Sequence, residues 1–289
     1  MADESRTMDG KTCLVTGGTS GIGEVAALEL ARKGARVLLV GRSPAKAEAT
    51  VARIRGATGN PAVESLLADL SSRAEVRRLA GEVRDKAPRL DVLVNNAGAM
   101  INPRRESVDG IEMTWALNHL GYFLLTDLLL GPLKAAAPSR VVSVASDAHR
   151  MLSGIDFDDV EGKKKYRAFR AYCQSKLANV LFTRELARRL EGSGVTANCL
   201  HPGFVATNFM TGQGPMHWVF RQMAPVFAVS PEKGAETTIY LASSPEVAGT
   251  TGEYFAKSKP NKATAAGRDD AAARRLWELS ERMVGPSAT

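Results

Sequence analysis

Tyr172 and Lys176 are the residues of this 289-residue chain whose types and spacing most directly suggest acid–base chemistry. Four residues along a helix place two side chains on the same face, one turn apart. A tyrosine has an ordinary pKa of about 10, and a neighbouring ammonium favours the phenolate and lowers that pKa. Such a phenol can give a proton to a carbonyl oxygen or take one from an alcohol. The same spacing also occurs by chance in surface pairs, so its interpretation depends on the rest of the chain.

A glycine-rich segment near the N-terminus lies between a β-branched run and a helical pattern that begins near residue 24. This context of strand, glycine turn and helix is typical of dinucleotide-binding segments. Gly17 permits a sharp turn, Gly21 allows close approach of a pyrophosphate, and Gly23 allows the helix to pack on the strand. The spacing Gly-x-x-x-Gly-x-Gly differs from the more common Gly-x-Gly-x-x-Gly, and a plain tight turn is the alternative. The predicted phosphate-binding residues are Gly17, Thr19, Ser20, Gly21, Ile22 and Gly23.

Arg42 indicates which dinucleotide is bound. NAD-binding folds carry a carboxylate about 20 residues after the glycines, where it binds a ribose hydroxyl. Here the second predicted strand is followed by an arginine instead. A guanidinium binds phosphate in a bidentate manner, so Arg42 favours NADP(H); the alternative is a solvent-facing side chain. Asp69 is placed to accept a hydrogen bond from adenine or to cap the helix near Ser71, and the adjacent Leu70 is a further predicted cofactor contact.

Polar residues also follow the fourth and fifth predicted strands. Asn95 and Asn96 can join neighbouring strand ends, while Ala97 and Gly98 leave room for a cofactor. Ser146 can hydrogen-bond a substrate oxygen. Because open α/β sheets bind ligands at the carboxyl ends of their strands, we expect these residues to line one site.

The elements that must position these residues alternate along the chain. Continuous apolar runs, typical of parallel strands buried on both faces, alternate with amphipathic helical segments. This pattern predicts a doubly wound α/β Rossmann fold with a seven-stranded, mostly parallel sheet, forming one domain over residues 1–289. The predicted strands are residues 12–16, 36–40, 63–67, 91–95, 140–145, 195–200 and 252–255.

Composition excludes several other classes of protein. The net charge of +7 is scattered apart from residues 163–165, and no basic stripe with interleaved aromatics predicts nucleic-acid binding. The three cysteines and four histidines lack the spacing of a disulfide framework or a metal site. The N-terminus resembles neither a signal peptide nor an anchor, and the longest apolar stretch, residues 120–133, is too short to span a bilayer. We therefore expect a cytoplasmic protein.

Taken together, these motifs resemble the short-chain dehydrogenase/reductase superfamily over nearly the whole chain. The matching segments, in order, are residues 16–23, residues 95–98, Asn118, Ser146, Tyr172 with Lys176, and His201-Pro202-Gly203. Residues 118–126 and 172–182, and the wide separation of Ser146 from Tyr172, are similar to the retinol dehydrogenase group. Membrane-bound members of that group carry an N-terminal hydrophobic anchor, and no such segment is present in this sequence.

The resemblance implies a role for each matching residue. Tyr172 would be the general acid/base, and Lys176 would lower its pKa and bind the nicotinamide ribose. Ser146 would orient the substrate, and Asn118 would hold a proton-relay water. The residues expected to flank the nicotinamide are Pro202, Gly203, Val205 and Thr207. The resemblance also implies a homodimer or homotetramer.

Residues 204–229 are rich in Phe, Met and Trp, and the resemblance places them over the active site as a substrate lid. An apolar lid favours a lipophilic or aromatic carbonyl or alcohol as substrate; the alternative is that these residues only pack on the domain. Residues 263–289 are predicted to end in a helix at about 270–283 that docks on this domain or on a partner subunit. Residues 1–9 are expected to form a tail.

Two other functions remain open at this point. The same fold can serve as a non-enzymatic NADP(H)-binding sensor or scaffold, although such proteins are expected to lose the catalytic residues that are present here. A reductase of C=C bonds, of the protochlorophyllide reductase type, is the other alternative.

Overall fold

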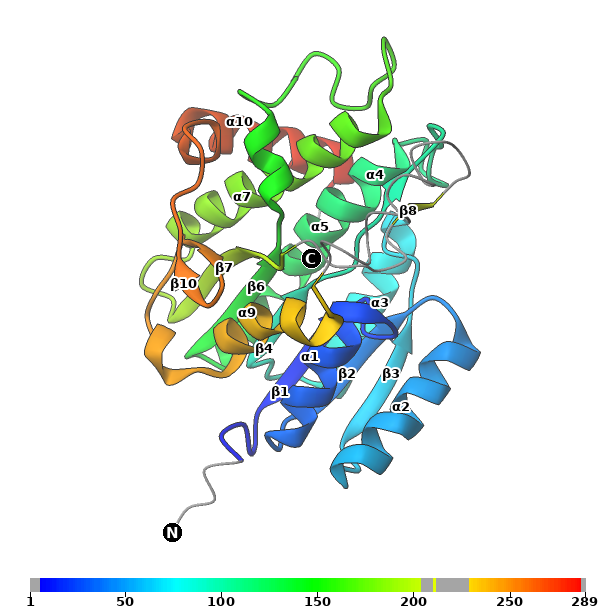
Figure 1. Ribbon diagram of the computed structural model, residues 1–289, viewed down its shortest axis with the longest axis vertical. Coiled ribbons are helices and arrows are strands. Elements are labelled where there is room, and N and C mark those ends of the chain that lie inside the picture. Colours follow the sequence, from blue (N-terminus) through cyan, green and yellow to red (C-terminus); the bar gives the residue numbers. More distant parts are fainter. Residues whose placement is uncertain (1–5, 204–209, 212–228, 287–289) are drawn as a thin grey trace.

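The computed structural model describes residues 6–203, 210–211 and 229–286. Its main sheet has the strand order β10-β9-β7-β6-β4-β1-β2-β3, and every neighbouring pair is parallel except β9 and β10 (Figure 1). Its strands are β1 (Thr12–Thr16), β2 (Arg36–Gly41), β3 (Val63–Leu67), β4 (Val92–Asn95), β6 (Ser139–Val144), β7 (Val195–His201), β9 (Tyr254–Ala256) and β10 (Lys259–Pro260). The predicted Rossmann fold is thus confirmed.

The strand count corrects the sequence prediction from seven to eight. The additional strand, β10, pairs antiparallel with β9 at the sheet edge and has two exposed residues, Lys259 and Pro260. A strand so short and exposed leaves no hydrophobic pattern from which it could be predicted. A separate parallel pair joins β5 (Met100–Ile101) to β8 (Met210–Thr211), which lies within the predicted lid. Residues 204–209 and 212–228 of that lid lie outside the described residues, as do residues 1–5 of the predicted tail.

Helices cover both faces of the sheet. Alternate residues of each strand point to opposite faces, so Leu14 joins the core beneath one helical layer, while Cys13 and Val15 join the core beneath the other. One layer contains α1 (Gly21–Arg32), α2 (Pro44–Thr58) and α9 (Pro231–Ser243). The other contains α3 (Arg73–Lys86), α5 (Gly121–Leu128), α7 (Ala168–Arg189) and α10 (Asp270–Val284). The short helices are α4 (Met113–Trp115), α6 (Leu130–Ala135), the π-helix η1 (Ala116–Leu120) and the 3-10 turns η2 (Asp147–Met151), η3 (Pro245–Val247) and η4 (Ala266–Arg268).

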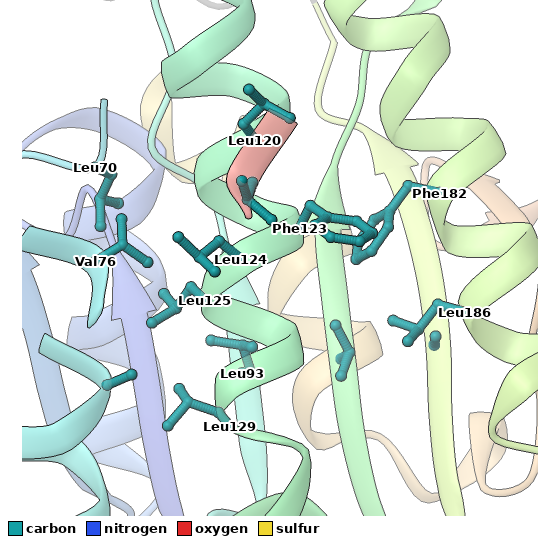
Figure 2. Packing of buried hydrophobic residues seen from close by; sticks show 14 of the residues in the cluster. Leu70, Val76, Leu93, Leu120, Phe123, Leu124, Leu125, Leu129, Phe182 and Leu186 are labelled. Carbon is teal, nitrogen blue, oxygen red and sulfur yellow. The ribbon is translucent and has the colours of Figure 1, made fainter. Parts of the chain in front are cut away.

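The larger core cluster lies between the sheet and α5. Figure 2 shows Leu124 and Leu125 on α5 near Leu93 of β4, and Phe123 beside Phe182 of α7. The rings of Phe123 and Phe182 meet edge to face, with 5.9 Å between their centroids. This packing fixes α5 and α7 against each other. Helix α7 itself carries Tyr172 and Lys176, and α5 directly follows residues 116–120, which include Asn118.

The C-terminal helix α10 docks on this domain, against α7. Its apolar residues Leu276 and Trp277 are buried, and Leu279 and Met283 are half-buried. The Trp277 ring stacks on Phe182, with 5.9 Å between the centroids.

Candidate active site

The glycine loop after β1 is shaped by close backbone contacts. Gly17 and Gly21 have φ values of 65° and 56°, in the left-handed region that favours glycine. A Cβ on Gly23 would lie 2.3 Å from the Gly17 carbonyl oxygen, and one on Gly17 would lie 2.9 Å from Ala97 Cα. The loop therefore has no room for side chains at these positions, and it directly abuts the segment after β4.

Helix α1 begins at Gly21 rather than near residue 24, so the loop runs straight into its first turn. Ser43, Ser72 and Ser230 accept hydrogen bonds from the first turns of α2, α3 and α9, but among the described residues Ser20 makes no such bond with α1. The first N–H groups of α1 are thus left for another acceptor. An uncapped helix start behind a glycine loop fits a pyrophosphate, as a nicotinamide dinucleotide would supply.

Thr16 and Asn96 join the ends of β1 and β4. The Thr16 hydroxyl accepts hydrogen bonds from the backbone N–H groups of Asn96 (2.8 Å) and Ala97 (3.1 Å). Asn96 Nδ2 donates to the Thr16 carbonyl at 2.8 Å. Asn95 points elsewhere and donates to Thr126 of α5 at 2.9 Å. Of the two asparagines predicted to join the strands, Asn96 therefore joins β1 to β4, whereas Asn95 fixes α5 to the sheet.

Arg42 is exposed just beyond β2 and makes no ion pair or hydrogen bond within the part of the chain that the structure describes. The glycine loop lies beside it, because Gly18 N–H donates to the Val40 carbonyl at 3.0 Å. Asp69 accepts from the backbone N–H (3.0 Å) and hydroxyl (2.7 Å) of Ser71, whereas the side chain that caps α3 is that of Ser72. Leu70 is buried, and a Cβ on Gly121 of α5 would meet its carbonyl oxygen at 2.6 Å.

Tyr172 and Lys176 both lie on α7, with Lys176 Nζ 5.7 Å from the centre of the Tyr172 ring. The Lys176 ammonium is buried and donates to the carbonyl of Val144, at the end of β6, at 2.7 Å. Ser146, two residues further, hydrogen-bonds the Tyr172 hydroxyl and lowers the pKa of that phenol against the larger effect of burial. The structure thus brings Ser146, Tyr172 and Lys176 together.

Asn118 lies in the π-helix η1, an element that is frequent at functional sites. Its amide accepts from Ala99 N–H at 2.9 Å and donates to the Ala99 carbonyl at 2.9 Å and to the Ser175 hydroxyl at 3.0 Å. A Cβ on Gly98 would lie 3.2 Å from Asn118 Oδ1 and 3.6 Å from Lys176 Nζ. Gly98 therefore connects the glycine-loop side of the site to the catalytic side.

The pKa of Tyr172 differs from the sequence expectation. Burial raises it to about 12, although a lowered value was expected from the neighbouring lysine. Burial also lowers the pKa of Lys176 to about 7, so its charge is only partly present at neutral pH. Desolvation is the largest cause of both shifts, because burial disfavours the charged form of each group.

Pro202 and Gly203 follow β7 and are partly exposed, and Gly203 has φ of 89°. Val205 and Thr207, predicted to flank the nicotinamide with them, lie outside the described residues.

Three further residues contact the site, and although they lie in the segments that resemble the family, no role was predicted for them. The centre of the buried Tyr122 ring lies 5.8 Å from Lys176 Nζ. Tyr122 is about one helical turn after Asn118. Ser175 holds Asn118, and His201 contacts the residue after Ser146. Spacing offered a signal only for Tyr122, four residues after Asn118; the other two contacts join elements that are distant in sequence.

Comparison with known proteins identifies the family of the chain. Residues 11–217 match the short chain dehydrogenase family, and the chain belongs to that family of oxidoreductases, which use a nicotinamide cofactor. Human retinol dehydrogenase 13 is 45% identical over 288 residues, covering 98% of this chain and 87% of the relative.

Two solved structures show the same fold. The structure of an uncharacterized protein from Mycobacterium paratuberculosis has a TM-score of 0.77 and 35% identity, covering 96% of this chain and 94% of that one. A short chain dehydrogenase from Burkholderia cenocepacia, solved in complex with NADP, has a TM-score of 0.68 and 26% identity, covering 86% and 96%. In the described part of the chain, none of the helices combines the length and apolar character that crossing a membrane requires.

Proposed function

We propose that the protein is an NADP(H)-dependent oxidoreductase that interconverts a carbonyl and an alcohol on a lipophilic or aromatic small molecule, with Tyr172 as general acid/base. The observation that carries this proposal is the position of the buried Lys176 side chain. Its Nζ lies 5.7 Å from the centre of the Tyr172 ring, and a Cβ on Gly98, near the glycine loop, would lie 3.6 Å from it. This arrangement supports a site at one edge of the sheet in which a phenol and an amine lie next to a glycine loop that could hold a dinucleotide.

In the proposed reaction, each residue of the site has its own role. When bound, the nicotinamide supplies or accepts the hydride. In the reducing direction the Tyr172 hydroxyl gives its proton to the carbonyl oxygen, while the Ser146 hydroxyl donates a hydrogen bond to the same oxygen. Lys176 stabilises the phenolate that remains, and Asn118 holds the water that returns a proton. Burial raises the pKa of Tyr172 to about 12, so the phenol carries its proton at neutral pH.

NADP(H) is favoured over NAD(H) because the Arg42 guanidinium is exposed just beyond β2, beside the glycine loop, and has no ion pair or hydrogen bond with any described residue. A 2′-phosphate there would gain a charge-assisted, bidentate contact. The Burkholderia relative that was solved with NADP supports this choice.

A lipophilic substrate is supported by the names of the relatives, which are retinol dehydrogenases, and by the apolar sequence of residues 204–229. We further propose that the protein is cytoplasmic. We also propose that it forms a homodimer or homotetramer, and light scattering of the purified chain measures this oligomeric state.

A turnover assay tests the proposal. Purified protein is mixed with NADPH and a panel of aldehydes and ketones that includes retinal, and NADPH absorbance is followed. We expect turnover that is fastest with lipophilic carbonyls. NADPH binding without turnover of any carbonyl or alcohol would favour the sensor alternative, and a saturated C–C product would identify a C=C reductase.

A further inference from the structure

Asp147 and His201 join the ends of β6 and β7 immediately beside Ser146. The backbone N–H of Asp147 donates to His201 Nδ1 at 3.2 Å, and His201 Nε2 lies 3.4 Å from Asp147 Oδ2. Because Nδ1 accepts a hydrogen bond, the ring is the neutral tautomer with its proton on Nε2, directed at the carboxylate. One imidazole thus contacts both the backbone and the side chain of Asp147.

The carboxylate of Asp147 extends this connection to a third strand. Its Oδ1 accepts from Arg150 Nε at 2.7 Å and from the hydroxyl of Tyr254, on β9, at 2.8 Å. Burial alone would raise the pKa of Asp147, but the hydrogen bonds from Arg150 and Tyr254 hold it below its ordinary value. The group is therefore an anion that links the carboxyl ends of β6 and β7 to Tyr254, the first residue of β9.

Ser146 is held from its other side by His149. His149 Nδ1 donates to the Ser146 carbonyl at 2.7 Å, and the Ser146 hydroxyl accepts from Ala148 N–H at 3.1 Å. The His149 ring meets Tyr254 edge to face, with 4.9 Å between the centroids. The groups that face His201 and its carboxylate partner are thus His149 and Arg150 from η2 and Tyr254 from β9, and they form one connected network.

We propose that Asp147 and His201 are positioning residues: their contact fixes the Ser146 hydroxyl relative to Pro202 and Gly203, on the nicotinamide side of the site. This inference rests on the proposed function. His201 directly precedes Pro202, and Asp147 directly follows Ser146, so a shift at the contact moves both sides of the site. A displacement of about 1 Å at a reacting centre can lower a rate by about a hundredfold.

The test compares His201→Phe with His201→Asn in the full chain. Phenylalanine keeps the aromatic volume and removes both nitrogens, whereas asparagine keeps an acceptor for the Asp147 N–H. We expect His201→Phe to lower kcat for carbonyl reduction by about ten- to a hundredfold, with KM for NADPH changed less than about threefold. His201→Asn should recover most of that loss. Tyr254→Phe, which removes one donor to Asp147, should lower kcat to a smaller extent. Its matched control Tyr240→Phe, at a half-buried tyrosine that bonds Glu246 away from the site, should leave kcat unchanged.

Nuclear magnetic resonance of ¹⁵N-labelled histidine provides a readout that does not depend on turnover. We expect His201 to be neutral with its proton on Nε2. A proton on Nδ1, or wild-type kcat in both His201→Phe and Tyr254→Phe, would overturn the inference. If the wild type turns over no carbonyl, the proposed function fails, and the His201 tautomer still decides whether the contact exists. If His201→Phe does not fold, His201→Asn and Tyr254→Phe supply the kinetic comparison.

Discussion

At the scale of single residues, the site depends on groups whose charge is costly to bury. Lys176 is 3% exposed, and its described hydrogen-bond acceptor is the neutral carbonyl of Val144. Its ammonium faces the rings of Tyr122 and Tyr172 at 5.8 and 5.7 Å. Attraction to these rings offsets only part of the desolvation cost, which explains why the pKa of Lys176 falls to about 7. At neutral pH the pair is therefore a neutral phenol and a partly neutral amine.

Tyr172→Phe tests the acid/base role. The substitution keeps the ring and removes the proton, so kcat should fall by about 10²- to 10⁴-fold, while NADPH affinity, measured by fluorescence, stays close to that of the wild type. Retention of more than about a tenth of the wild-type kcat would show that another group supplies the proton.

Arg42→Ala tests the choice of cofactor. Loss of a charge-assisted contact to the 2′-phosphate, worth about 1.5–3 kcal/mol, should raise KM for NADPH by about ten- to a hundredfold and leave KM for NADH nearly unchanged. Arg84→Ala, which removes an exposed arginine on α3, is the matched control for net charge. Equal changes in both Michaelis constants would rule out the phosphate contact.

At the scale of elements, α7 connects the site to the C-terminal helix. Its N-terminal half carries Tyr172 and Lys176, while further along Phe182 packs on Trp277 of α10. The guanidinium of Arg189 lies 4.3 Å from the Trp277 ring centre. The π-helix η1 also contacts α10, because His119 Nε2 forms a hydrogen bond with the Ser280 hydroxyl at 2.8 Å. Helix α10 thus supports the elements that carry Asn118, Tyr172 and Lys176.

Trp277→Ala should accordingly destabilise the whole domain. Removing a buried tryptophan costs about 3–5 kcal/mol, and urea unfolding followed by circular dichroism measures the loss. Glu278→Ala, at the adjacent exposed position, should change the free energy of unfolding by less than about 0.5 kcal/mol. A small effect of Trp277→Ala would mean that α10 contributes little to the fold.

At the scale of the whole molecule, one buried histidine should make stability depend on pH. Burial lowers the pKa of His119 to about 3 in the folded chain, against an ordinary value of 6.5. Below pH 6.5 the unfolded chain binds a proton that the folded chain does not. The contribution of His119 to stability is therefore complete above that pH and is lost as the pH falls toward 3, by about 1.4 kcal/mol per pH unit.

His119→Gln removes this titration. The free energy of unfolding of the variant should fall less steeply between pH 6 and about 4 than that of the wild type. The two slopes should differ by about 1.4 kcal/mol per pH unit, the value for one proton. Denaturant unfolding at several pH values measures both slopes, and equal slopes would show that His119 is protonated in the folded protein.

The amino-acid sequence by itself determined the layered α/β fold, because buried parallel strands and amphipathic helices leave periodic apolar patterns. It also determined the glycine loop and the pairing of Tyr172 with Lys176, because these depend on local backbone geometry and helical spacing. Only the tertiary structure decided the ionisation of that pair, since desolvation depends on everything packed around it. It alone also revealed β10 and the contact of Asp147 with His201, because a two-residue edge strand and a hydrogen bond between two strand ends leave no periodic trace in the chain.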